Sequence, residues 1–117
     1  NLPADLLHVF EFRDESWFAE PVREVLTRHS LSFCIVSMPE LQCPLWVTGP
    51  AVYIRFHGSG ALYAGRYSRE ELAAWAATIH DMVGRGYDVY AYFNNDAWGH
   101  AVINARELRD MVERILR

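Results

Sequence analysis

Four short stretches of the chain are rich in β-branched and aromatic residues, and segments with helical periodicity separate them. This pattern is typical of a parallel sheet, in which helices connect the strands in place of hairpin turns. The predicted strands are Leu7–Phe12, Ser32–Ser37, Ala51–Phe56 and Asp88–Phe93.

Three segments carry apolar residues at helical spacing. Ala19–His29 is predicted as a helix with a proline in its first turn, where the missing N–H costs little. Arg69–Val83 has the best-defined start, because Ser68 and Glu71 have the spacing of a capping box. His100–Leu116 is predicted as the last helix from a single apolar stripe.

The order of these elements predicts an α/β fold. Met38–Pro50 contains three prolines and a glycine, so we expect a long connection without a helix there. Alternating strands and helices require right-handed crossovers, which fit either a small open doubly wound sheet or part of a (β/α)₈ barrel. A complete barrel takes about 250 residues. The chain has 117, so we expect one domain over residues 1–117 that is at most half a TIM barrel, with about four strands and three helices.

Charge and composition narrow the functional classes. Fifteen Asp and Glu residues against eleven Lys and Arg give a formal net charge of −4, which argues against nucleic-acid binding by net charge and leaves only a local basic site. No apolar run approaches the roughly 18 residues of a membrane span, and the first residues lack the pattern of a signal peptide. We therefore expect no membrane partner and a cytoplasmic protein. Cys34 and Cys43 are too few for a disulfide scaffold and are expected to be reduced thiols.

Polar side chains gather where the predicted strands end. Side chains alternate across a strand, so the polar positions of the first, third and fourth strands share one face while apolar residues occupy the other. Chemistry in barrels and open α/β sheets collects at the carboxyl ends of the strands. Six side chains are therefore expected to point toward a common interior: Glu11, Arg13, Arg55, His57, Tyr92 and Asn94.

These residue types suit an anionic ligand. Arg13 and Arg55 would orient an anion through forked hydrogen bonds, and Glu11 and His57 are the candidates for proton transfer in catalysis. An adjacent arginine should keep Glu11 ionised. The further ligand-binding candidates are Tyr92, Asn94, Asn95, His100 and Asn104. Asn104 lies on the core stripe of the last helix, where it either caps a neighbouring loop or reaches the site.

Three functional hypotheses follow. The first is an enzyme, or an enzyme-like domain, that binds an anionic or phosphate-containing small molecule. The second is a nuclease-like, metal-assisted phosphodiesterase in which Glu11, His57 and His100 hold a divalent ion, although no paired histidines or runs of carboxylates support it. The third is a non-catalytic binding or assembly module, because an Arg–Glu pair across strands can serve packing alone. The sequence carries no serine-nucleophile, nucleotide-loop or zinc-peptidase motif, and it leaves any cofactor unknown.

Three sequence blocks resemble successive motifs of the YecE-like family, also called domain of unknown function 72 (DUF72). The blocks are Glu11–Arg13 with Ser16–Trp17, then Tyr53–Gly58, then Tyr90–Asn95 followed by Gly99–Ala101 and Asn104–Ala105. The resemblance extends from about Leu7 to the last helix. It implies a TIM barrel of roughly twice this length, with this chain similar to the carboxyl-terminal half, in a family without a settled activity.

A half-barrel leaves two sheet edges unpaired, which soluble proteins seldom tolerate. We therefore expect one of three arrangements to cover these edges. The missing amino-terminal half is supplied in some form, two copies associate as a symmetric dimer, or the sheet closes in a different way. Leu45 and Trp46 in the long connection are apolar enough to contribute to an interface.

Overall fold

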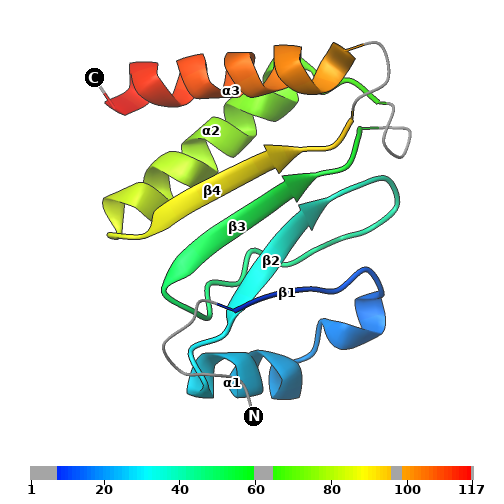
Figure 1. Ribbon diagram of the computed structural model, residues 1–117, viewed down its shortest axis with the longest axis vertical. Coiled ribbons are helices and arrows are strands. Elements are labelled where there is room, and N and C mark those ends of the chain that lie inside the picture. Colours follow the sequence, from blue (N-terminus) through cyan, green and yellow to red (C-terminus); the bar gives the residue numbers. More distant parts are fainter. Residues whose placement is uncertain (1–7, 60–64, 96–98, 117) are drawn as a thin grey trace.

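The computed structural model describes residues 8–59, 65–95 and 99–116, and these residues form the predicted alternation of strands and helices. Four parallel strands and three helices confirm the α/β fold class. In chain order the elements are β1 (Val9–Glu11), a 3₁₀ turn (Glu15–Trp17), α1 (Glu20–Arg28), β2 (Ser32–Ser37), β3 (Ala51–Phe56), α2 (Arg69–Gly84), β4 (Asp88–Phe93) and α3 (His100–Leu116) (Figure 1).

The first strand differs most from its predicted bounds. Leu7 lies outside the described residues, and Phe12 lies beyond the end of β1. β1 pairs with β2 over three residues only, and the chain then turns at Asp14, whose carboxylate accepts a hydrogen bond from the Ser16 N–H at 2.9 Å. This side-chain bond starts the 3₁₀ turn and stops the strand early. The other three strands have the predicted bounds.

The strands lie in the order β1-β2-β3-β4, so β1 and β4 form the edges of the sheet. Register aligns the strands in rows across the sheet. One row joins Glu11, Cys34, Tyr53 and Tyr90, and the second row beyond it, toward the carboxyl ends, joins Val36, Arg55 and Tyr92. Residues of these rows share one face of the sheet because strand side chains alternate.

The apolar residues of the strands pack against the helices on the other face. Leu26 of α1, Ile79 of α2 and Leu108 of α3 join one buried cluster with Phe33 and Ile54 of the sheet. The connection between β2 and β3 has no helix, as predicted, and Trp46 takes part in covering the core by packing its ring 5.0 Å from that of Phe33. Trp46 is therefore partly buried against the core, whereas Leu45 is exposed.

The capping box predicted for α2 is present. The Ser68 hydroxyl accepts a hydrogen bond from the Glu71 N–H at 3.1 Å, and the Glu71 carboxylate accepts one from the Ser68 N–H at 2.9 Å. These bonds satisfy two N–H groups that the first turn of a helix otherwise leaves without a partner. The cap fixes where α2 begins, and with it the face that α2 turns to the sheet.

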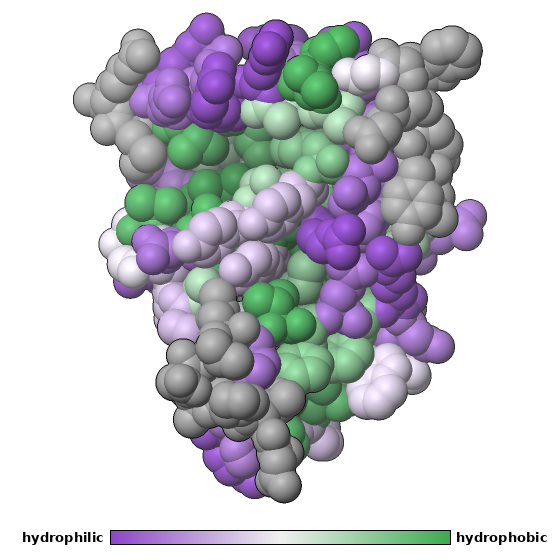
Figure 2. Space-filling view, viewed as in Figure 1, coloured by the Kyte–Doolittle hydropathy of each residue, from purple (hydrophilic) through white to green (hydrophobic). Residues whose placement is uncertain are grey.

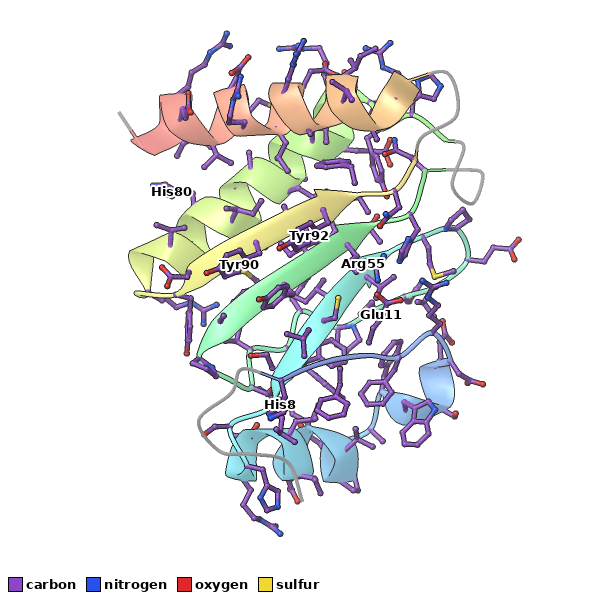
Figure 3. All side chains as sticks on the ribbon, in the orientation of Figure 1. His8, Glu11, Arg55, His80, Tyr90 and Tyr92 are labelled. Atoms are coloured by element: carbon purple, nitrogen blue, oxygen red, sulfur yellow. The ribbon has the colours of Figure 1, made fainter. Side chains whose placement is uncertain are left out.

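The polar face of the sheet is open in the described part of the chain. Tyr90 and Tyr92 of β4 are 42% and 49% exposed on it, and Figure 3 shows Tyr92 near Arg55, with Tyr90 farther back along β4. The same face carries a band of pale, weakly hydrophilic surface beside strongly hydrophilic surface (Figure 2). No described helix has the length and apolar character needed to cross a membrane.

Candidate functional site

Backbone hydrogen bonds extend the sheet by one residue past the strand ends. The His57 N–H donates to the Ser37 carbonyl, and the Asn94 N–H donates to the Phe56 carbonyl, each at 2.8 Å. His57 and Asn94 therefore continue the side-chain alternation of β3 and β4. Gly58 follows at φ +130°, a conformation open to glycine, and lets the chain leave the sheet at this point.

A carboxylate shared by two arginines forms the centre of the site. Glu11 Oε2 accepts a hydrogen bond from Arg13 Nε at 2.5 Å, and Glu11 Oε1 accepts one from Arg55 Nη1 at 3.2 Å. Arg55 Nη2 also donates to Asn94 Oδ1 at 3.1 Å. Side chains from β1, β3 and the end of β4 thus meet on the open face, as the alternation predicted; Figure 3 shows Glu11 and Arg55 close together there.

His57 joins this cluster in its neutral form. Its side chain is fully buried, with Nε2 lying 3.2 Å from Arg13 Nη2 and 3.6 Å from Glu11 Oε2. Burial lowers the pKa of His57 below its ordinary value, the Arg13 charge lowers it further, and the Glu11 charge offsets this only in part. A neutral ring lets Nε2 accept the Arg13 hydrogen bond, which places the ring proton on Nδ1.

Glu11 is ionised. Burial alone would raise the pKa of its carboxyl, but the hydrogen bond from Arg13 and the charges of Arg13 and Arg55 outweigh that and hold the pKa below its ordinary value. The neighbouring Cys34 is a neutral thiol, because burial and the Glu11 charge raise its pKa to about 12.

A cavity of about 400 Å³ lies over the cluster on the open face of the sheet. It is lined by Val9, Glu11, Cys34, Tyr53, Arg55, Tyr92 and Asn94. Glu11, Arg55, Tyr92 and Asn94 were candidate site residues from the sequence. Val9, Cys34 and Tyr53 were not, although the same alternation that selected Arg55 also puts Tyr53 on this face. The thiol of Cys34 points to Glu11 Oε1 at 3.8 Å, so this residue lines the cavity as well as being buried.

The structure brings Asn95 and Asn104 together away from the cavity. Both are fully buried, and Asn95 Nδ2 donates to Asn104 Oδ1 at 2.9 Å. Asn104 also accepts from the Tyr67 N–H at 2.9 Å and donates to the Tyr67 carbonyl at 3.1 Å. Of the two roles considered for Asn104, the geometry matches the loop cap: it binds the backbone that leads into α2.

The Tyr67 side chain extends this buried connection to the strand ends. Its hydroxyl lies 2.8 Å from the Ser37 hydroxyl and accepts a hydrogen bond from the Gly58 N–H at 3.1 Å. Asn104 and Tyr67 therefore tie α3, the start of α2 and the ends of β2 and β3 to one another. We call Asn95, Asn104 and Tyr67 the polar latch. It supports the strand ends on which His57 is placed.

His100 does not line the cavity over the charged cluster. It begins α3, and its Nδ1 is buried with no hydrogen-bond partner among the described residues. The metal hypothesis required His100 beside Glu11 and His57. Within residues 8–59, 65–95 and 99–116, no three or more His, Cys, Asp or Glu side chains form a group that could hold a metal ion.

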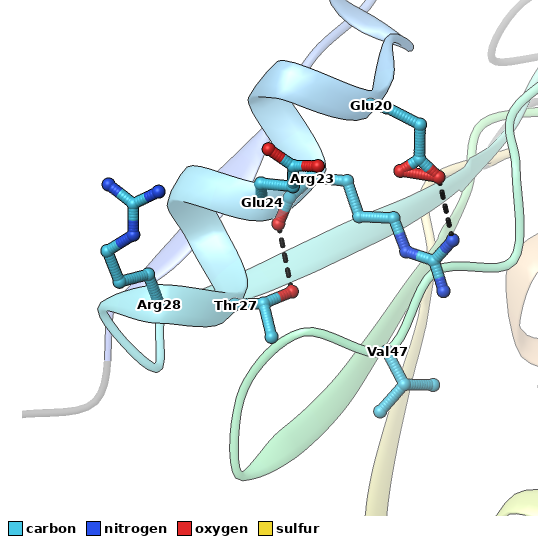
Figure 4. Close-up of a pocket in the computed structure, with 6 residues that line it drawn as sticks. All are labelled: Glu20, Arg23, Glu24, Thr27, Arg28 and Val47. Atoms are coloured by element: carbon cyan, nitrogen blue, oxygen red, sulfur yellow. Dashed lines mark hydrogen bonds and ion pairs between the residues drawn. The ribbon is translucent and has the colours of Figure 1, made fainter.

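A second hollow, of about 460 Å³, lies along α1 (Figure 4). Its charged groups bond to one another: Arg23 Nη1 donates to Glu20 Oε1 at 3.1 Å, and the Thr27 hydroxyl donates to the Arg23 carbonyl at 2.8 Å. Glu20 and Arg23 are both well exposed, so this ion pair contributes little to stability. The arrangement is that of a solvated helix face.

Parallel strands covered by helices on one face, with a charged cluster at their carboxyl ends on the other, define the protein as an α/β domain of the kind that builds barrels and open sheets. The chain belongs to the DUF72 family: the family model, described as a protein of unknown function, matches residues 1–116. The expected family is thereby confirmed.

Known proteins similar to this chain come from several bacteria. The UPF0759 protein YunF of Bacillus subtilis is 23% identical over 93% of this chain and 48% of its own length. A DUF72 family protein from Thermotoga maritima is 31% identical, with a TM-score of 0.86 over 93% of this chain and 47% of that structure. Another, from Enterococcus faecalis, is 25% identical with a TM-score of 0.83. The chain spans about half the length of these relatives.

Proposed function

We propose that the protein binds a small anionic ligand, a phosphate ester or a carboxylate, on the open face at the carboxyl ends of its strands. The observation that carries the proposal is the Arg55 guanidinium, which lines the cavity with N–H groups that it does not use on other described residues. Arg55 uses two of its five N–H groups, on Glu11 and Asn94, and the other three have no hydrogen-bond partner among the described residues. A guanidinium with N–H groups left over beside a cavity suits recognition of an anion.

Arg13 and Asn94 support this role. Arg13 adds a second positive charge on the far side of Glu11, and Asn94 holds the Arg55 guanidinium at 3.1 Å so that its plane is fixed before a ligand arrives. A guanidinium that is already ordered loses less side-chain entropy on binding. Removing Asn94 should therefore weaken the anion complex without removing any charge.

Glu11 and His57 are the candidates for proton transfer in this site. At neutral pH the lowered pKa values leave Glu11 as a carboxylate and His57 as a neutral imidazole. Glu11 can then accept a proton directly, whereas His57 can do so only at Nε2, once that atom releases the Arg13 hydrogen bond. An enzyme built on this pair would abstract a proton from its bound ligand, and we propose no further step.

Isothermal titration calorimetry tests anion binding directly. The purified protein would be titrated with inorganic phosphate, glucose 6-phosphate, AMP and benzoate, and at least one should bind saturably. Arg55→Ala should abolish that binding. Arg85→Ala is the matched control, because Arg85 is an exposed arginine that pairs with Asp81 at 3.3 Å, outside the cavity. Absence of binding by every anion, or equal loss in both variants, would contradict the proposal.

We propose a second role, assembly, from the surface beside β4. β4 is an edge strand, and a groove of about 240 Å³ follows it between the sheet and the helices. The groove is lined mainly by apolar residues: Ile79, Val89, Ala91, Phe93, Ala105, Leu108 and Val112, with Arg109 and Glu113 at its rim. An unpaired strand beside apolar surface is a typical site of strand association.

The proposed occupant of this groove is a second copy of the chain. The relatives contain about as much chain again as the part matched here, which is the amount of chain that a second copy would supply. Sedimentation velocity should then give a dimer that Ala91→Lys dissociates. Ala73→Lys, on the exposed side of α2, should leave it intact. A monomer at all concentrations would refute self-association and leave the anion site untouched.

A further inference from the structure

The sheet has an unpaired strand at each edge in the described part of the chain. β1 lies at one edge and β4 at the other, and all three strand pairings between them are parallel (Figure 1). Each edge therefore presents backbone groups to which one more parallel strand can bond. The β1 edge of one copy has the direction that the β4 edge of another copy requires.

Side chains at both edges are exposed on the polar face. Val9 of β1 is 38% exposed and Tyr92 of β4 is 49% exposed, and both line the cavity of about 400 Å³. On the helix side, the apolar groove follows β4. Val102 of α3 is 57% exposed and continues the stripe of Ala105 and Val112 at this groove. A partner that covers the groove and the open end of the cavity together has to add to the sheet at its edge.

A second copy of the chain supplies what a closed sheet requires. A (β/α)₈ barrel has eight parallel strands and about 250 residues. Two copies of this four-stranded sheet supply that number of strands, and two chains of 117 residues have about that length. A twofold axis along the barrel puts β4 of each copy beside β1 of the other and pairs all four edges. Pairing β4 with β4 would instead leave both β1 edges open.

The geometry of such a barrel fixes which residues meet. Its register shifts by about eight residues around the eight strands, and so by about four across each copy. The sense of the shift follows from Glu11 and Arg55, which bond to each other although Arg55 lies two residues beyond the row of Glu11 and two strands away. Residues at one level of the barrel thus advance by one residue per strand. This register puts Val9 of one copy beside Tyr92 of the other.

Resting on the self-association proposed above, we propose that two copies close an eight-stranded parallel barrel whose shared interior is the polar face. Val9 and Glu11 of the second copy then supply the wall that the cavity lacks beyond Tyr92. Phe10, on the helix side of β1, covers the apolar groove. The charged clusters of both copies face one enclosed interior.

Disulfide cross-linking between singly substituted chains tests this arrangement. Val9→Cys and Tyr92→Cys would be co-expressed with different tags and oxidised, since adjacent strands lie about 4.8 Å apart, within reach of a disulfide. Up to about half of the chains should be linked, because random pairing makes about half of the dimers mixed. Neither variant alone should cross-link. The unsubstituted protein shows what Cys34 and Cys43 contribute.

Two further samples sharpen the test. Asp88→Cys is the matched control, because Asp88 is exposed on the same strand, four residues and roughly 13 Å before Tyr92. With Val9→Cys it should give no cross-link. The double variant Val9→Cys/Tyr92→Cys should give linked dimers only, because two copies close a ring. A ladder of longer polymers would show open edge-to-edge contacts and would overturn the closed barrel.

Hydrogen exchange followed by NMR needs no substitution and covers the case in which a variant does not fold. His8 bonds to β2 and Asn94 bonds to β3, so the alternation of parallel strands turns the next amides outward. In the closed barrel these outward amides are bonded at both edges. They should exchange at least about tenfold more slowly in the dimer than at concentrations where it dissociates. The amides are those of Val9 and Glu11 in β1 and of Ala91 and Phe93 in β4.

The outcomes separate this inference from the self-association on which it rests. Cross-linking of Tyr92→Cys alone, or a dimer in which the β1 amides exchange as fast as in the monomer, would overturn the closed barrel and leave self-association standing. A monomer at all concentrations would overturn both.

Discussion

Replacing Asn104 by alanine should destabilise the protein without changing its affinity for an anion. Asn104 is fully buried and makes four side-chain hydrogen bonds, two of them to the backbone of Tyr67. Alanine leaves the Tyr67 N–H and carbonyl without these partners at a residue that is only 3% exposed. The expected effect is therefore on folding, because no bond of Asn104 reaches the charged cluster.

The size of the effect follows from those two backbone groups. A buried donor or acceptor left without a partner costs about 1–3 kcal/mol. Two such groups give about 3 kcal/mol when water entering the space left by the side chain offsets part of the loss. For a chain of this size, that corresponds to a fall in melting temperature of about 10–15 °C. Asn95 still has the Gly65 carbonyl at 3.1 Å and adds little to the cost.

Urea denaturation and calorimetry together check this prediction. Arg106→Ala is the matched control, an exposed substitution on the same helix, and should change the free energy of unfolding by less than about 0.5 kcal/mol. If Asn104→Ala were as stable as the control, the polar latch would contribute nothing. If it lost anion affinity while remaining folded, Asn104 would act in the site and the present placement would be refuted.

Three further outcomes are expected. Ser68→Ala should cost about 1 kcal/mol in urea denaturation by removing the α2 cap, and Ser68→Asp should not. The pKa of Glu11 is lower in the folded protein than its ordinary value of 4.5, so its contribution to stability is complete above pH 4.5 and is lost as the pH falls through the folded pKa. The free energy of unfolding should therefore fall more steeply from pH 5 to 3 in the unsubstituted protein than in Glu11→Gln. Parallel curves for the two proteins would contradict this. Cys34, with a pKa of about 12, should react with iodoacetamide at pH 8 far more slowly in the folded than in the urea-unfolded protein, and equal rates would contradict its burial.

The charged cluster was predictable because it depends on local alternation and on the shared direction of parallel strands. Glu11, Arg55 and Asn94 lie at equivalent ends of their strands, so a period of two residues was enough to put them on one face. The face of β4, which was assigned only by analogy with the other strands, also agrees: Tyr92 lines the cavity.

The polar latch was not predictable by the same means. Asn95 follows the last strand residue by two positions, where the chain is leaving the sheet and the alternation of side chains has ended. The backbone partners of Asn104 belong to Tyr67, 37 residues away along the chain. Helical periodicity predicts which face of the helix a residue occupies, but not which other segment of the chain packs against that face. Tyr53 lines the cavity on the same face of β3 as Arg55, so the alternation of side chains was enough to find it.

The most direct test of the anion site is an NMR titration that follows the Nε–H signals of the arginines. When a binding anion is added, the Arg55 signal should move and saturate together with the calorimetric isotherm, while that of Arg85 stays in place. An Arg55 signal that does not move, or that moves no more than Arg85 at saturation, would show that the charged cluster serves packing alone.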